Sequence, residues 1–149
     1  FGLISLERSC NYLYLNKYDM ARQWATDALN EFAAEGRPHH VALADHTVGL
    51  AFAYSDQYDE AFLHLYSARD YWEETDNLYQ SIHINHTIAF TEARRGKSTN
   101  ALKLLYRTKE MCDTIPDSRQ RKYQLRKMDF LITKIESGED IKEVSPDKF

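Results

Sequence analysis

Apolar residues recur at intervals of three and four through most of the chain, the spacing that gathers them on one side of an α-helix. The clearest stripe consists of Tyr58, Ala61, Phe62, Leu65, Ala68 and Trp72. The run from Val41 to Tyr54 is apolar or small on more than one side, so its helix should be packed between neighbours. The pattern predicts helices at about 2–15, 18–35, 39–55, 58–75, 78–95 and 98–113.

Turn and capping residues separate these segments. The helices are joined in pairs by Asn16-Lys17, Asp56-Gln57 and Gly96-Lys97, and the pairs are separated by Gly36-Arg37-Pro38, Thr75-Asp76-Asn77 and Ile115-Pro116. These residues supply a glycine stop, polar caps and a proline that cannot continue a helix. A seventh helix is expected from Asp117 or Ser118 to Gly138, and its apolar face consists of Leu125, Met128, Leu131, Ile132 and Ile135.

The chain repeats itself with a period of 40 residues, since Asn16–Ala21, Asp56–Ala61 and Gly96–Ala101 occupy equivalent positions. Small residues occur at the same positions in each copy of the repeat. They are Ser9, Ala21 and Ala28, then Gly49, Ala61 and Ala68, then Ala89, Ala101 and Thr108. Because two helices approach closely only where side chains are small, these positions are the predicted packing points within each pair.

This repeat resembles the tetratricopeptide repeat. The second unit carries Gly49, Tyr58, Ala61 and Ala68 at the matching positions, the first carries Ser9, Tyr18, Ala21 and Ala28, and the third departs with Ser98 and Thr108. The resemblance implies an all-α, right-handed α–α superhelix of three helical hairpins plus a C-terminal capping helix. The expected domain covers residues 1–137, with units at about 2–37, 38–76 and 77–115, a capping helix at 117–137, and a tail or linker at 138–149.

The period exceeds the usual 34 residues of the family. It is similar to the longer repeats of bacterial cytoplasmic regulators that sense signalling peptides, of the Rap, PlcR and NprR type. The resemblance implies a protein- or peptide-binding module of a larger intracellular regulatory protein, with the ligand in the concave groove. The alternative is a constitutive scaffold or a self-association domain that forms a homodimer. Its interface would use aromatic residues of the second helices, such as Trp24, Tyr66 and Tyr71.

Composition narrows the function classes. Only 5 Gly and 3 Pro among 149 residues disfavour turn-rich β folds, and a net charge of −4 disfavours direct nucleic-acid binding. The chain has no apolar run long enough to span a membrane. Cys10 and Cys112 lie far apart without a CxxC partner, which predicts no disulfide framework and a reducing, cytoplasmic location.

The sequence offers little for catalysis or metal binding. It lacks a GxSxG elbow and a glycine-rich phosphate loop, so we expect that the chain is not an enzyme by itself. His83 and His86 share a helix face, and His46 recurs one repeat earlier, but three imidazoles from two helices of neighbouring repeats are more simply polar groove residues than a zinc site. We therefore expect no metal and no cofactor. The basic run Arg119–Lys127 is interpreted as a solvated cap face, or as a contact for an acidic partner.

In the resembled family, the first helix of each unit lines the concave side. Positions on the helix face next to the small packing residue therefore predict the ligand site. The predicted peptide-binding residues are Tyr14, His46, Tyr54, His83, His86, Phe90 and Arg94. Aromatic pockets, imidazoles and a carboxylate-binding arginine suit a peptide, although the aromatics can equally belong to the core.

Overall fold

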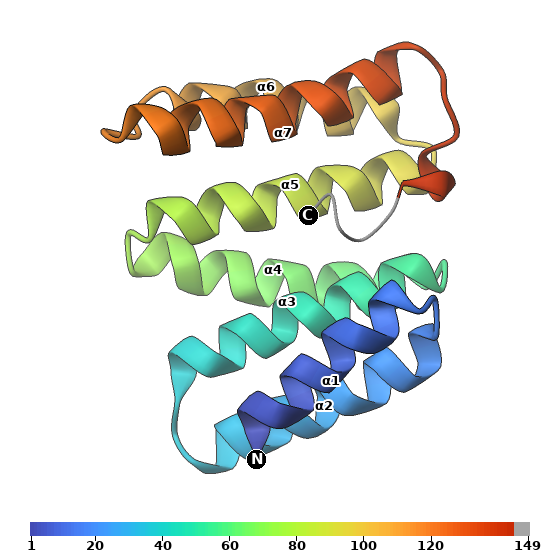
Figure 1. Ribbon diagram of the computed structural model, residues 1–149, viewed down its shortest axis with the longest axis vertical. Helices are drawn as coiled ribbons and strands as arrows, with labels where there is room; N and C mark the ends of the chain where they lie inside the picture. Colours follow the sequence, from blue (N-terminus) through green and yellow to red (C-terminus); the bar gives the residue numbers. More distant parts are fainter. Residues whose placement is uncertain (145–149) are drawn as a thin grey trace. The chain divides into compact units, whose positions relative to one another are not determined.

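The computed structural model describes residues 1–144, apart from the side chain of Glu143. This part of the chain is helical throughout and holds no β-strand, which confirms the predicted all-α fold class (Figure 1). The chain divides into two compact units, one from Phe1 to Asp76 and one that begins at Asn77. The α-helices are α1 (Gly2–Tyr14), α2 (Tyr18–Ala34), α3 (Pro38–Tyr54), α4 (Tyr58–Glu74), α5 (Leu78–Arg94), α6 (Ser98–Cys112) and α7 (Ser118–Glu136), followed by a 3-10 helix, η1 (Ile141–Glu143).

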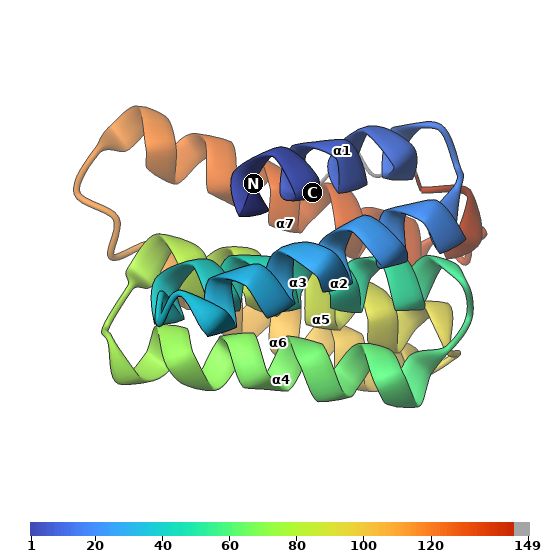
Figure 2. The ribbon, with the colours of Figure 1, turned by 90° about the horizontal axis from the view of Figure 1, so that it is seen from below.

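In the first unit, the four helices pack in chain order. α1 packs on α2, α2 on α3 and α3 on α4, and α3 also contacts α1. Figure 2 shows α1 and α2 side by side. Since α3 has three neighbours, it is buried on several sides, as the run from Val41 to Tyr54 predicts.

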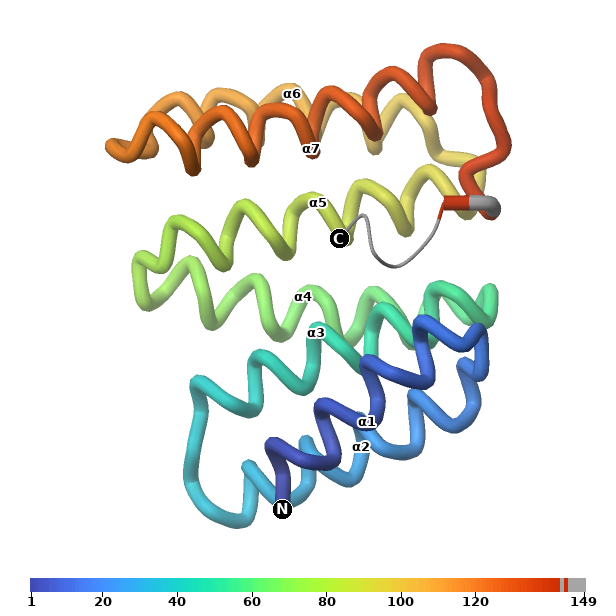
Figure 3. The backbone as a smooth tube through the Cα atoms, in the orientation of Figure 1, coloured from blue at the N-terminus to red at the C-terminus, as the bar shows by residue number. Residues whose placement is uncertain are grey.

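Left-handed residues end most of the helices. Gly36 has a φ of 66°, its amide donates to the carbonyl of Ala33 at 3.1 Å, and the next amide, of Arg37, donates to Phe32 at 3.0 Å. These two bonds satisfy carbonyls that the helix itself leaves unpaired. The same conformation is adopted by Asn16, Asp56, Asp76, Gly96 and Gly138. Within the first unit, the backbone trace shows the short turns that join α1 to α2 and α3 to α4 (Figure 3).

The close approach of α3 to α4 depends on Gly49. A Cβ atom at this position would lie 2.6 Å from Cδ2 of Leu65 and 3.1 Å from the carbonyl oxygen of Ala61. At the equivalent position of the first repeat, the hydroxyl of Ser9 donates to the carbonyl of Ala21 at 2.6 Å. All nine small residues that keep phase in the repeat are buried, so their role as packing points is confirmed.

In the second unit, α5 packs on α6 and α6 on α7, while α7 and η1 also contact α5. Asp117 caps α7 as predicted, because its carboxylate accepts from the amide of Gln120 at 2.9 Å. The predicted apolar face of α7 is buried at Met128, Leu131, Ile132 and Ile135. The right-handed superhelix stays a prediction.

The segment after α7 is more ordered than its sequence indicates. Of the tail or linker predicted at 138–149, residues 145–149 lie outside the described residues. Residues 141–143 form η1, which Asp140 caps by accepting from the amide of Lys142 at 2.9 Å, and Ile141 and Val144 are buried. A single turn buries only two apolar side chains, which is too few to give a detectable period.

Across residues 1–144, every helix falls short of the length and hydrophobicity that crossing a membrane requires. Both cysteines are free thiols. Burial, the largest cause, raises the pKa of Cys112 to about 11, and the charge of Asp113 acts in the same direction. The Cys112 thiol is therefore protonated and unreactive at neutral pH.

Candidate functional site

The predicted ligand residues of the first unit differ in exposure. Tyr14 is 58% exposed at the end of α1, whereas His46 and Tyr54 on α3 are only 7% and 5% exposed. The ring of Tyr54 stacks on the repeat tyrosine Tyr18, with centroids 5.1 Å apart. In this unit, one of the three side chains is presented to solvent and two are taken up by packing.

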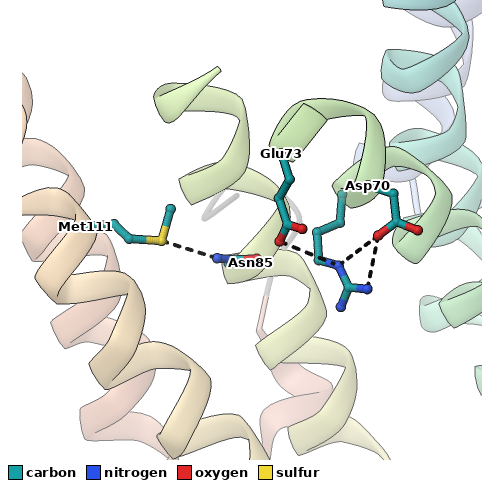
Figure 4. Close-up of polar contacts among 5 residues, drawn as sticks. Asp70, Glu73, Asn85 and Met111 are labelled. Carbon is teal, nitrogen blue, oxygen red and sulfur yellow. Dashed lines mark hydrogen bonds and ion pairs between the residues drawn. The ribbon is translucent and has the colours of Figure 1, made fainter. Parts of the chain in front are cut away.

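The predicted residues of the second unit all lie on α5. Phe90 and His86 are buried, His83 is half-buried, and Arg94 ends the helix with 9% of its surface exposed. Asn85 on the same helix donates from its side-chain amide to Sδ of Met111 on α6, at 3.6 Å (Figure 4). That amide therefore takes part in the packing of α5 against α6.

The two histidines of α5 are kept neutral. Burial, and then the charge of Lys127 on α7, lowers the pKa of His83 to about 4. The pKa of His86 falls to about 3 for the same two reasons, helped by His83 and opposed by a hydrogen bond with the Lys127 backbone. Burial also lowers the pKa of Lys127 itself. These imidazoles are uncharged at neutral pH, so they offer hydrogen bonds rather than a cation.

Arg94 is already bound to a peptide group. Its Nη1 donates to the carbonyl oxygen of Lys142 at 3.3 Å, and its guanidinium carbon lies 5.7 Å from the centroid of Phe90. The next residue, Arg95, makes a separate ion pair, with Nε and Nη2 at 3.0 and 3.1 Å from the carboxylate of Glu92. The two neighbouring arginines thus serve different groups, and Arg94 holds a backbone carbonyl of the segment that follows α7.

An unpredicted polar cluster joins α3 to α4. Nδ1 of His64 lies 2.9 Å from Oδ1 of Asp45, and the hydroxyl of Ser67 donates to the other carboxylate oxygen at 3.3 Å. The ring of His64 stacks on Phe52 at 5.8 Å. In a serine nucleophile the hydroxyl donates to the imidazole; here the carboxylate accepts from both groups and joins the helices.

Asp45 and Ser67 also border a hollow of about 360 Å³ in the first unit, with Arg37 and Tyr71 at its sides. The remaining walls are small or apolar, namely Ala33, Gly36, Pro38, Val41 and Ala42. Nη2 of Arg37 is 3.0 Å from Nε2 of His40, and its Nη1 is 3.3 Å from Glu35. Sequence reasoning missed the hollow, although His64 and Ser67 lie three apart on the α4 face toward Asp45.

The basic run of α7 has mixed roles. Arg121 donates to the carbonyl of Ile115 at 2.8 Å and so closes the loop before α7, while Lys127 is half-buried near the α5 histidines. Arg119, Lys122 and Arg126 are exposed. Three of the five cations are therefore on the surface, where either a solvated face or an acidic partner accounts for them.

Arg69 makes ion pairs with acidic residues of its own helix, α4. Nε of Arg69 lies 3.4 Å from Oδ1 of Asp70 and 3.8 Å from Oε1 of Glu73 (Figure 4). Such exposed pairs contribute about 0–1 kcal/mol. Among the residues that the structure describes, no group of three or more His, Cys, Asp or Glu is arranged to hold a metal ion.

In comparisons with known proteins, no family model, no curated protein and no solved structure matches this chain significantly. Its relation to the tetratricopeptide repeat therefore rests on the residues of the repeat itself and stays a proposal.

Proposed function

We propose that this chain is a protein- or peptide-binding module of a larger intracellular regulatory protein, built from hairpins of the tetratricopeptide type. The α5 face of the second unit, around Phe90 and Arg94, is its recognition surface. Helical hairpins supply a rigid frame, and a ligand adds its own chain to one helix face.

One observation carries this proposal, namely the hydrogen bond from Arg94 to the carbonyl oxygen of Lys142. It is a contact between a charged side chain and a backbone group, so it does not depend on which residue supplies the carbonyl. Ile141 and Val144 are buried on either side of it. The contact supports α5 as a surface that accepts a short stretch of peptide.

Charge also favours one class of ligand. Residues 1–76 carry 5 Lys and Arg against 13 Asp and Glu, a formal charge of −8, whereas residues 77–149 carry 14 against 10, a charge of +4. Opposite charge raises association rates and suppresses wrong partners. We therefore propose that the second unit binds acidic peptides with apolar side chains.

A peptide-library selection on the immobilised full chain tests this function. We expect selected peptides to carry acidic and aliphatic residues. In NMR titrations they should shift the amide signals of α5, and Arg94→Ala should weaken their binding severalfold. Arg126→Ala is the matched control, since Arg126 is an exposed arginine of α7. Enrichment of no peptide, or of peptides that bind equally to the Arg94→Ala variant, would contradict the proposal.

A second candidate, self-association or scaffolding, is favoured by the exposed face of α1. Five apolar side chains of α1 and its two flanking residues are more than half exposed: Phe1, Leu3, Ile4, Tyr14 and Leu15. Exposed apolar patches commonly mark protein interfaces. Sedimentation at increasing concentration separates the two functions. A dimer that Leu3→Glu converts to monomer supports self-association through α1, and a monomer at all concentrations excludes it.

A further inference from the structure

We propose that the segment Ile141–Val144 is an internal ligand of the α5 face, which competes with an outside peptide of the same pattern. The pattern is an acidic residue followed by two aliphatic residues three positions apart. This inference rests on the peptide-binding function proposed above, and it adds the ligand class and a means of regulation.

The contacts of the segment define that ligand. Its backbone is held by Arg94 through the carbonyl of Lys142, while the two aliphatic side chains on either side are 8% and 7% exposed. Lys142 is exposed, and the atom that Arg94 contacts is its backbone carbonyl oxygen. We therefore assign the specificity to Ile141 and Val144, the two side chains that are buried next to this contact.

Acidic residues precede the aliphatic pair. Asp140 caps η1, so its carboxylate favours the turn that brings the two aliphatic side chains to one side. Glu139 accepts from Lys134 at the end of α7. A peptide with the same acidic start would preserve both the turn and the attraction to a positively charged unit.

The connection to α7 makes the internal segment an effective competitor. Only residues 137–140 separate α7 from η1, and so short a connection holds the segment near the α5 face at an effective concentration of about 1 mM or more. If the free segment binds with a dissociation constant near 0.1 mM, the face is occupied about ten times more often than it is empty. An outside ligand then binds about tenfold more weakly than it would to an open face.

The test compares the wild-type chain with the double variant Ile141→Ala/Val144→Ala, both at full length. The probe is a synthetic peptide of residues 138–144, GEDIKEV, titrated while the amide signals of α5 are followed by NMR. We expect the double variant to bind the probe about tenfold more tightly than wild type. A peptide with alanine in place of isoleucine and valine, GEDAKEA, should bind neither protein.

Lys142→Ala is the matched control, because it keeps the carbonyl that Arg94 contacts. It should behave as wild type. If the double variant loses its helical circular dichroism, Ile141→Ala alone provides the comparison, with an expected gain of about threefold.

Two results would overturn the inference, and they differ in whether the proposed peptide-binding function also fails. If library-selected peptides bind wild type and double variant equally, the segment is not a competitor and α5 is still a binding face. If neither protein binds any peptide up to several millimolar, both the inference and the proposed function fail.

Discussion

The phenol of Tyr58 donates a hydrogen bond to Oδ1 of Asp56 at 2.7 Å, across the turn between α3 and α4. The first repeat has the same contact, from Tyr18 to Oδ1 of Asn16 at 3.0 Å. Asn16 and Asp56 both adopt the left-handed conformation, with φ near 58° and 59°. The repeat tyrosine therefore stabilises a turn residue that pays a conformational cost.

The third repeat lacks both members of this hydrogen-bonded pair. There the left-handed position is Gly96, which has no side chain to accept a hydrogen bond, and the tyrosine is replaced by Ser98. Glycine reaches a positive φ without strain. The two substitutions are therefore linked: because Gly96 adopts the left-handed conformation without strain, the turn needs no stabilising tyrosine, and Ser98 can occupy that position.

We predict that Tyr58→Phe lowers the free energy of unfolding by about 0.5–1 kcal/mol, as expected for one hydrogen bond. In an Asp56→Gly background, the same substitution should have almost no effect, because the acceptor is gone. Urea denaturation of the four proteins measures this double-mutant cycle. Equal losses in both backgrounds would show that the phenol contributes through other contacts.

We predict that Gly49→Ala destabilises the chain even though alanine is the better helix former. The added Cβ would lie 2.6 Å from Cδ2 of the fully buried Leu65. Overpacking costs about 1–3 kcal/mol, against a gain of about 1 kcal/mol in helix propensity. In a Leu65→Ala background, which removes the two closest contacts and leaves the Ala61 carbonyl oxygen at 3.1 Å, Gly49→Ala should cost clearly less by thermal denaturation. A stabilised single variant would contradict the close packing of α3 and α4.

We predict that stability falls as the pH is lowered from about 6.5 toward 4. The folded state keeps His83 and His86 neutral, with pKa values of about 4 and 3, while the unfolded chain protonates both near pH 6.5. The unfolded state therefore binds more protons in this window, and each histidine costs up to about 1.4 kcal/mol per pH unit. Above pH 6.5 neither contributes a slope.

Two measurements check this pH dependence. Urea denaturation at successive pH values should show a shallower slope for His86→Gln than for wild type, and NMR titration of the imidazole signals should find both histidines neutral at pH 5.5. Protonation of His86 near pH 6.5 in the folded protein would disprove it.

The sequence predicted the helices almost to their ends because their signals are local. Apolar spacing, Gly36 and the cap at Asp117 act within one turn, and the 40-residue echo placed the small residues correctly. Asn16 and Asp56 were recognised as turn residues, but only the structure shows that the repeat tyrosines bond to them.

The candidate site was less predictable, because it depends on contacts between distant residues. Phase along α3 and α5 placed His46, Tyr54 and Phe90 at the groove, yet phase alone does not tell a solvent-facing position from one covered by another helix, and all three are buried. The bond from Arg94 to Lys142 joins residues 48 apart through a backbone carbonyl, which leaves no side-chain signal in the sequence.

Arg94→Ala, made in the Ile141→Ala/Val144→Ala background, tests most directly whether α5 is a recognition surface. Under the proposal, the same arginine of the wild-type chain holds either the internal segment or an outside peptide, so part of the effect of its removal cancels. With the internal segment released, affinity for a selected peptide should fall about ten- to a hundredfold, equivalent to about 1.5–3 kcal/mol for a hydrogen bond from a charged group. The melting temperature should change little. A lower melting temperature with unchanged affinity would contradict the account, because Arg94 would then serve only the stability of the fold.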